Sequence, residues 1–162
     1  MFKPWKADTE KTWEDCAEED FKHWKIPRIC KDPEDLENVK GVVRKYYSQL
    51  KHIFYSLISC EEYPHVGWMN FTEFSEQVSI IDAAHHVDLA TIDRTFIVTN
   101  YDDQHVEGNP VQQLCRYEFM EILVRLAGEK FKRKRGPITT FAEAFETFLN
   151  ENVLLHCKPP AW

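Results

Sequence analysis

A long run of apolar residues at helical spacing constrains the first half of the chain more than any other feature. Asp32-Pro33 is a strong helix start, because an aspartate at the N-cap accepts free amides and a proline at the first position needs no N–H. Apolar residues then recur every three or four positions: Leu36, Val39, Val43, Tyr46, Leu50, Phe54, Leu57 and Ile58. This stripe predicts one amphipathic helix that ends near Cys60, before Pro64 and Gly67.

Four shorter helices are predicted further along the chain. Asp88 is suited to cap one of them, Asn109-Pro110 repeats the cap-and-proline start, and Thr140-x-x-Glu143 is a capping box. The expected bounds are about 71–81, 89–100 and 110–131, followed by a fifth helix from 140. These patterns together predict an all-α fold.

The connection between the first two helices carries a recognisable pattern. Residues 67–74 read Gly-Trp-Met-Asn-Phe-Thr-Glu-Phe, and residues 114–119 repeat the ending as Leu-Cys-Arg-Tyr-Glu-Phe. Both resemble the second half of the calcium loop of the EF-hand superfamily. The resemblance implies that Gly67 makes the sharp turn, that Met69 pairs with the sister loop, and that Glu73 stands at the chelating position.

The resemblance covers residues 36 to 131 and implies paired helix-loop-helix units whose helices open a hydrophobic groove for a partner helix. Residues 109–127 also resemble EF-hand-like proteins of protist cilia and flagella. We therefore expect three parts: an irregular, aromatic N-terminal arm over residues 1–31 with at most a short helix near 14–24, an EF-hand-like pair over 32–131, and a C-terminal helix and tail over 137–162.

Most calcium ligands are missing from the first loop. Counting from Glu62, the third and fifth loop positions are Pro64 and Val66, which offer no side-chain oxygen, whereas calcium takes about six to eight oxygens. The first loop is therefore expected to be empty, with Glu73 a capping or solvated acid.

Two interpretations of the second unit stay open. We favour a helix start at Asn109-Pro110, which leaves no calcium loop. An expanded loop from Asn100 would instead place four acids near one ion: Asp102, Asp103, Glu107 and Glu118. No metal or other cofactor is expected, and calcium in this second loop is the alternative.

Composition excludes several functional classes. The 162 residues carry a formal net charge of −7, which disfavours a nucleic-acid partner. No window approaches the ~18 apolar residues of a membrane span, so no membrane insertion is expected.

The five cysteines show no paired spacing, which favours a reducing, cytoplasmic compartment. Because nucleophile elbows and phosphate-binding glycine loops are missing, we predict that the protein is not an enzyme. An unfamiliar enzyme or zinc protein remains the third hypothesis.

One basic run, residues 130–135, stands out in this acidic chain. Cations are favoured near the last carbonyls of a helix, and Gly136-Pro137 follows as a stop. We interpret the run as a solvated helix end; contact with an acidic partner or a membrane surface is the alternative.

The tryptophans are the expected partner-binding residues. Trp68 falls at an exposed loop position, and the others lie in segments without helical periodicity; the full set is Trp5, Trp13, Trp24, Trp68 and Trp162. Tryptophan is enriched where one protein anchors on another. For the arm as a whole we favour packing on its own core, with the surface of a partner as the alternative.

The resulting hypothesis is a non-enzymatic, EF-hand-like interaction or scaffold protein that works without calcium. It would act as a subunit of a larger assembly of other proteins, in a ciliary or axonemal setting. The alternative is a calcium sensor that binds the ion in the second loop and switches a hydrophobic partner groove.

Overall fold

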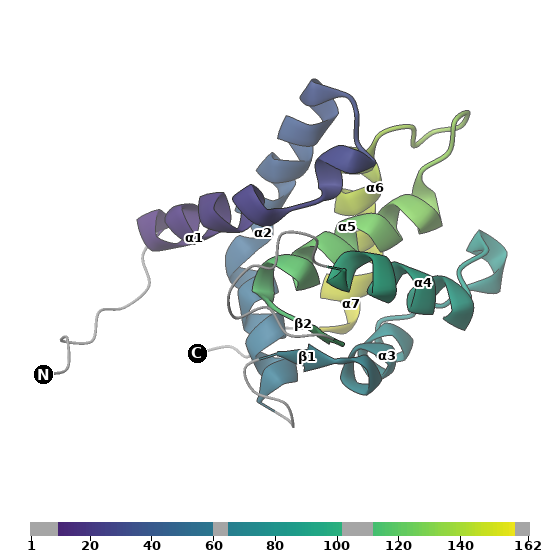
Figure 1. The fold of residues 1–162 in the computed structure, drawn as a ribbon. Helices are drawn as coiled ribbons and strands as arrows, with labels where there is room; N and C mark the ends of the chain where they lie inside the picture. Colours follow the sequence, from purple (N-terminus) through teal and green to yellow (C-terminus); the bar gives the residue numbers. More distant parts are fainter. Residues whose placement is uncertain (1–9, 60–64, 102–111, 158–162) are drawn as a thin grey trace, which may run out of the picture.

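The computed structural model describes residues 10–59, 65–101 and 112–157, and this part of the chain is mostly helical (Figure 1). In chain order the elements are α1 (Glu10–His23), η1 (Ile26–Arg28), α2 (Pro33–Ile58), β1 (Val66–Gly67), α3 (Trp68–Gln77), η2 (Ala83–His85), α4 (Leu89–Asn100), β2 (Gln113–Leu114), α5 (Arg116–Phe131), α6 (Phe141–Phe148), the π-helical η3 (Leu149–Val153) and α7 (Leu154–His156). The all-α class expected from the sequence is confirmed at this level. The N-terminal arm is less irregular than expected, since α1 begins at Glu10 and runs to His23.

Side-chain caps fix the helix starts that the sequence predicts. The Asp32 side chain accepts a hydrogen bond from the backbone amide of Glu34 at 3.0 Å, at the start of α2. The Thr140 hydroxyl accepts one from the amide of Glu143 at 3.2 Å, at the start of α6. Each bond satisfies an amide that has no partner within its own helix.

The cap of α4 gives a pH-dependent prediction. Asp88 Oδ1 accepts from both the amide and the hydroxyl of Thr91, each at 2.8 Å, and the backbone bond lowers the pKa of Asp88. A carboxyl with a lowered pKa stabilises the fold above its unfolded pKa of about 3.9, and this contribution is lost as the pH falls through the folded pKa. Asp88→Asn keeps an accepting oxygen but does not titrate. We expect it to be less stable than the wild type at neutral pH in urea unfolding, with the difference shrinking in acid. A pH-independent difference would contradict this.

Two short strands join the two halves of the fold. β1 and β2 pair antiparallel, with Val66 opposite Leu114 and Gly67 opposite Gln113. β1 lies between α2 and α3, and β2 precedes α5 and follows α4. The described chain therefore contains two helix-strand-helix units that meet at the strand pair low in Figure 1.

The strand register corrects two sequence predictions. Gly67 does not make a sharp turn, because its φ of −76° and ψ of 167° are those of an extended strand residue. Met69 does not pair the loops; it lies on α3 and is 71% exposed. The pairing residue is Val66, three positions earlier, since α3 begins at Trp68 rather than near Phe71.

The predicted start of the fourth helix is also wrong. Leu114, expected inside that helix, lies in β2, and α5 begins only at Arg116. Gln112 has a φ of 67°, a left-handed conformation that no α-helix continues through. Asn109-Pro110 itself lies outside the described residues. Burial of Leu114 opposite Val66 outweighs the local helix preference.

Phe119 lies at the centre of the core. Its ring centroid is 5.5 Å from that of Phe54 on α2, 6.5 Å from Phe71 and 5.9 Å from Phe74 on α3. Phe71 and Phe119 are each the fourth residue of their helix, so α3 and α5 insert the same side chain at the same place. Aromatic pairs at such separations add to the burial energy of each ring.

Helix α6 fills the space against α2 and α5. It packs on both helices, and its Phe145 and Phe148 side chains are fully buried. The buried carboxylate of Asp35, in the first turn of α2, accepts from the amides of Phe141 and Ala142 at 2.9 and 3.0 Å. A side chain from one helix therefore caps the N-terminus of another.

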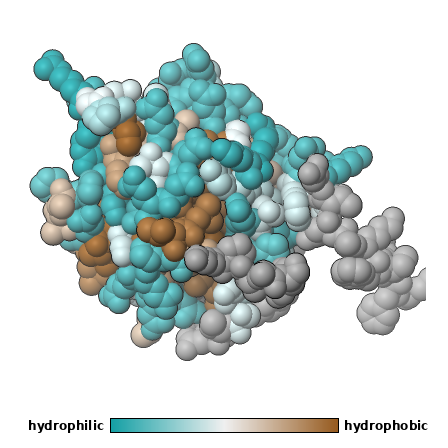
Figure 2. All heavy atoms as spheres, turned by 180° about the vertical axis from the view of Figure 1, so that it is seen from behind, coloured by the Kyte–Doolittle hydropathy of each residue, from teal (hydrophilic) through white to brown (hydrophobic). Residues whose placement is uncertain are grey.

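The face shown in Figure 2 is mostly hydrophilic, with separate apolar patches. The large apolar residues that stay exposed are Ile29, Tyr55, Met69, Leu89, Ile97, Val98, Tyr101 and Leu155. No helix in the described ranges combines the length and apolar character needed to cross a bilayer.

Candidate functional site

Asn100 links the end of α4 to the second strand and to α5. Its Nδ2 donates to the carbonyl oxygen of Gln113 at 2.7 Å and lies 3.5 Å from Glu118 Oε1. Its Oδ1 accepts from the amide of Gln112 at 2.6 Å, which fixes which end of the side-chain amide faces the two oxygens. The last residue of α4 thus closes its own loop through hydrogen bonds.

Glu118 caps α5 in addition to facing Asn100. It is the third residue of the helix, it is buried, and its Oε1 accepts from the amide of Cys115 at 3.2 Å. Burial, and then the neighbouring Glu118 carboxylate, raise the pKa of the Cys115 thiol. The carboxylate oxygen that a loop cation would use is therefore already engaged by donors from the chain.

The Asn100 amide nitrogen lies close to two oxygens of the kind that calcium binds in proteins. It is 2.7 Å from the carbonyl oxygen of Gln113 and 3.5 Å from Glu118 Oε1. The other predicted ligands, Asp102, Asp103 and Glu107, lie outside the described residues.

The first unit has an amide where the second has a carboxylate. Asn70 is the third residue of α3, the place that Glu118 takes in α5. Its Nδ2 is buried and has no hydrogen-bond partner. Glu73, the predicted chelating position, lies one turn further on and is exposed, as expected for a solvated acid. In residues 10–59, 65–101 and 112–157, no group of three or more His, Cys, Asp or Glu side chains is placed to hold a metal ion.

Trp24 is a core residue, which corrects its predicted place outside the core. It is 7% exposed, its ring packs edge-on against Phe21 at 4.8 Å, and its Nε1 donates to the carbonyl of Tyr117 at 3.0 Å. Phe21 is also buried, and α1 packs against both α2 and α5. The Trp24 ring therefore packs against the core, and its N–H has a hydrogen-bond acceptor inside the protein.

The remaining tryptophans divide into two groups. Trp68 opens α3 and is half-buried, with its ring 5.4 Å from that of Phe96, so it is not the exposed loop residue expected. Trp13 is half-buried against the core. Trp5 and Trp162 lie outside the described residues. Binding of a partner through Trp13 or Trp68 stays a prediction for their exposed parts.

A buried ion pair fixes the arm to the core. The Arg116 guanidinium holds the carboxylate of Asp20 through both oxygens at 3.0–3.2 Å, and the Tyr47 hydroxyl donates to Asp20 Oδ2 at 3.0 Å. Burial opposes the charged guanidinium, but the bonds to Asp20 outweigh it and raise the pKa of Arg116. Sequence reasoning missed this cluster. Its trace is that Asp20 interrupts the apolar face formed by Ala17, Phe21 and Trp24.

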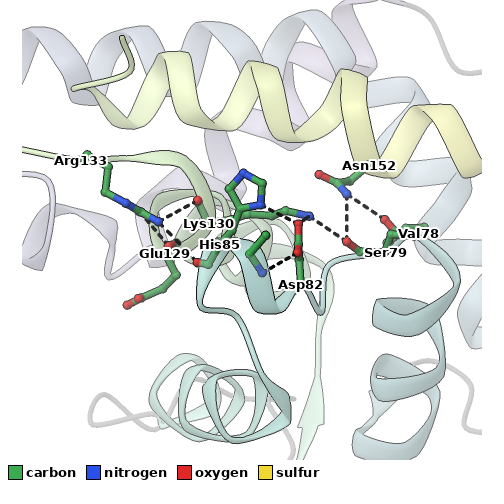
Figure 3. Close-up of polar contacts among 9 residues, drawn as sticks. Val78, Ser79, Asp82, His85, Glu129, Lys130, Arg133 and Asn152 are labelled. Atoms are coloured by element: carbon green, nitrogen blue, oxygen red, sulfur yellow. Dashed lines mark hydrogen bonds and ion pairs between the residues drawn. The ribbon is translucent and has the colours of Figure 1, made fainter. Parts of the chain in front are cut away.

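A second polar cluster holds the end of α3 (Figure 3). The carbonyl of Ser79 accepts from Lys130 Nζ at 2.8 Å and from Asn152 Nδ2 at 3.1 Å, and the carbonyl of Val78 accepts from the same amide at 3.1 Å. Asp82 lies 3.8 Å from Lys130 Nζ and binds His85 Nδ1 at 2.6 Å. Lys130 is therefore buried and structural, which corrects its interpretation as part of a solvated helix end.

The chain was compared with family models, curated proteins and solved structures. No family model, no curated protein and no solved structure matches it.

Proposed function

We propose that this chain is a non-enzymatic, EF-hand-like interaction or scaffold protein that works without calcium as a subunit of a larger assembly. The observation that carries the proposal is the pairing of two helix-strand-helix units through Val66 and Leu114. Equivalent phenylalanines, Phe71 and Phe119, follow the two strands at the same helical position. This arrangement is that expected of two EF-hand-like units joined at their loops.

Independence from calcium is supported by the donors in the second loop. The Asn100 amide reaches the carbonyl and carboxylate oxygens that an ion would need, and it belongs to the chain. In the first unit Asn70 of α3 takes the position that Glu118 takes in α5. A loop closed by its own side chain needs no ion to bring α4, β2 and α5 together.

The position of α6 also favours a scaffold over a sensor. A sensor needs an apolar groove that opens for a partner helix. Here the apolar space against α2 and α5 contains Phe145 and Phe148 of the same chain, and Asp35 caps the helix that carries them. A partner is therefore expected on another surface.

Calorimetric titration of the wild-type protein with calcium tests the proposal. We expect no binding heat at micromolar ion and no change in the binding of an apolar dye. Partners that co-purify with the tagged protein should be the same in calcium and in chelator. Micromolar binding accompanied by newly exposed apolar surface would overturn the proposal in favour of the sensor.

Replacement of the Asn100 amide gives a sharper test. Asn100→Asp removes the donor and sets a second carboxylate against Glu118, so we expect a loss of about 1–3 kcal/mol in the free energy of unfolding in chelator. Calcium should recover part of that loss in the variant and have no effect on the wild type, as measured by urea unfolding. Asn38→Asp, the same change at an exposed site on α2, is the control and should show neither effect. If calcium changed the stability of the wild type and of Asn100→Asp equally, the proposal that the Asn100 amide makes the second loop independent of calcium would be contradicted.

The cellular setting rests on the sequence resemblance alone. Residues 109–127 point to cilia or flagella, and the tagged protein is expected there. Fluorescence microscopy of a ciliated cell that expresses the tagged protein tests this expectation. Exclusion of the tagged protein from the axoneme would remove the ciliary setting from the proposal.

A further inference from the structure

Helices α4 and α5 pack against each other, and residues of both line one cavity near the C-terminal half of α5. Its volume is about 510 Å³. One wall comes from α4 and the other from α5 and the chain that follows it, and Ile29 and Phe141 also contribute to the lining. This size falls within the ~300–1,000 Å³ of sites that hold small ligands or a few side chains.

The lining is basic although the whole chain is acidic. Arg94, Arg125, Lys132, Arg133 and Lys134 contribute to it, against the single acid Glu129. Two of these cations are engaged elsewhere. Arg125 pairs with the buried Glu121 at 3.1 Å, and Arg133 donates to backbone carbonyls, including that of Lys130 at 3.2 Å.

Three cations remain for a ligand. In the described ranges Arg94, Lys132 and Lys134 form no ion pair; Arg94 donates only to the Thr91 hydroxyl at 3.4 Å, and Lys132 Nζ lies 4.9 Å from the centre of the Phe141 ring. Unpaired cations that line one concavity attract anions more strongly than the same charges on an open surface, because the low-dielectric walls focus their field.

The cavity also has an apolar side. Ile29, Val98 and Phe141 line it, and Val98 is 51% exposed. Ile97 on α4 and Tyr101, which follows the helix, are also exposed. A ligand that fits therefore carries negative charges and apolar groups within a few ångströms of each other.

Shape and net charge decide between kinds of polyanion. A bilayer surface is flat and does not enter a concavity, and the formal net charge of −7 repels an anionic membrane or a nucleic acid as a whole. A short peptide segment enters the cavity and meets only the local field. A segment with both carboxylate and apolar side chains matches the cationic and the apolar residues of the lining.

We propose that the cavity between α4 and α5 binds an acidic, partly apolar peptide segment of a partner protein. The carboxylates of that segment lie against Arg94, Lys132 and Lys134, and its apolar side chains lie on Val98 and Phe141. The inference rests on the proposed function, for which it names the class of partner.

The test uses the full chain and a fluorescent peptide of glutamate and leucine at helical spacing. We expect saturable binding, weakened by salt because the contacts are ionic. The double variant Arg94→Glu/Lys134→Glu should lose about tenfold or more in affinity, since it reverses two charges of the wall. The control Lys22→Glu/Lys45→Glu makes the same change in net charge at two exposed lysines on α1 and α2 and should bind as the wild type does.

Several results would overturn the inference. These are equal losses in the two double variants, equal binding of a lysine–leucine peptide, and binding of phosphatidylserine vesicles or inorganic phosphate with no binding of the acidic peptide. None of them touches the proposed function, which the calcium titration and the chelator co-purification test separately.

Discussion

Arg116→Ala is expected to lower the free energy of unfolding by about 3 kcal/mol, the lower end of the range for breaking a buried ion pair. The Asp20 side chain is 3% exposed, and of its hydrogen-bond partners among the described residues only the Tyr47 hydroxyl would remain to the charged carboxylate. The Arg116 side chain is 29% exposed, so water replaces part of the lost interaction. Urea unfolding followed by circular dichroism measures the loss. Hydrogen exchange should show the largest increase in α1, which the ion pair joins to α5.

Arg44→Ala is the matched control for that measurement. Arg44 also pairs with acids, Glu18 at 2.7 Å and Glu37 at 3.1 Å, but the side chains of these acids are 55% and 64% exposed, in contrast to that of Asp20. Exposed pairs contribute about 0–1 kcal/mol. If Arg116→Ala cost no more than Arg44→Ala, the Asp20 cluster would not hold α1 to the core.

Phe145→Ala is expected to cost about 3–5 kcal/mol, the range for deleting a buried phenylalanine ring. The ring is fully buried on the face of α6 that packs against α2 and α5, and nearby helices can collapse only in part around the space it leaves. The loss is measured by urea unfolding. Amides in residues 141–148 should exchange faster than those of α4, because the change loosens α6 first.

Leu155→Ala is the control for this second variant. It also truncates an apolar side chain near the C-terminal end of the fold, but Leu155 is 61% exposed. Its loss is expected within about 0.5 kcal/mol, as for most surface changes. A similarly small loss for Phe145→Ala would mean that α6 is not docked through this ring.

Local signals predict the helices well. Asp32, Asp88 and Thr140 each accept an amide at the helix start that the sequence indicates, and the apolar stripe of α2 faces the core. These features depend on residues within a few positions of each other. A cap or a helical stripe is therefore readable without knowledge of the fold.

Long-range pairing is where the sequence misleads. The Gly-x-apolar-x-x-x-Glu-Phe pattern aligns Met69 with Leu114, but the strands align Val66 with Leu114. Only two residues of each strand pair, and so no alternation of polar and apolar residues sets the register. In the same way, local preference favours a helix from Asn109-Pro110, and burial of Leu114 opposite Val66 prevents it from including Leu114.

The candidate site depends on contacts that a linear reading does not contain. In the sequence Asn100 is only the end of a helix or the start of an expanded loop, and Asp35 is one acid shortly after the helix start at Asp32-Pro33. Their partners, Glu118 for one and the amides of Phe141 and Ala142 for the other, are distant in sequence. A polar residue at a helix end is common, and its partner follows only from the packing.

The hydrogen bonds of Asn100 have a consequence for thermodynamic linkage. A bound ion stabilises a fold by an amount that rises with ion concentration, because only the occupied fraction contributes. An amide that is covalently part of the chain is present at a fixed effective concentration, and its contribution does not follow the composition of the medium. The contribution of this junction between α4, β2 and α5 to stability is therefore expected to stay the same when the ionic composition of the medium changes.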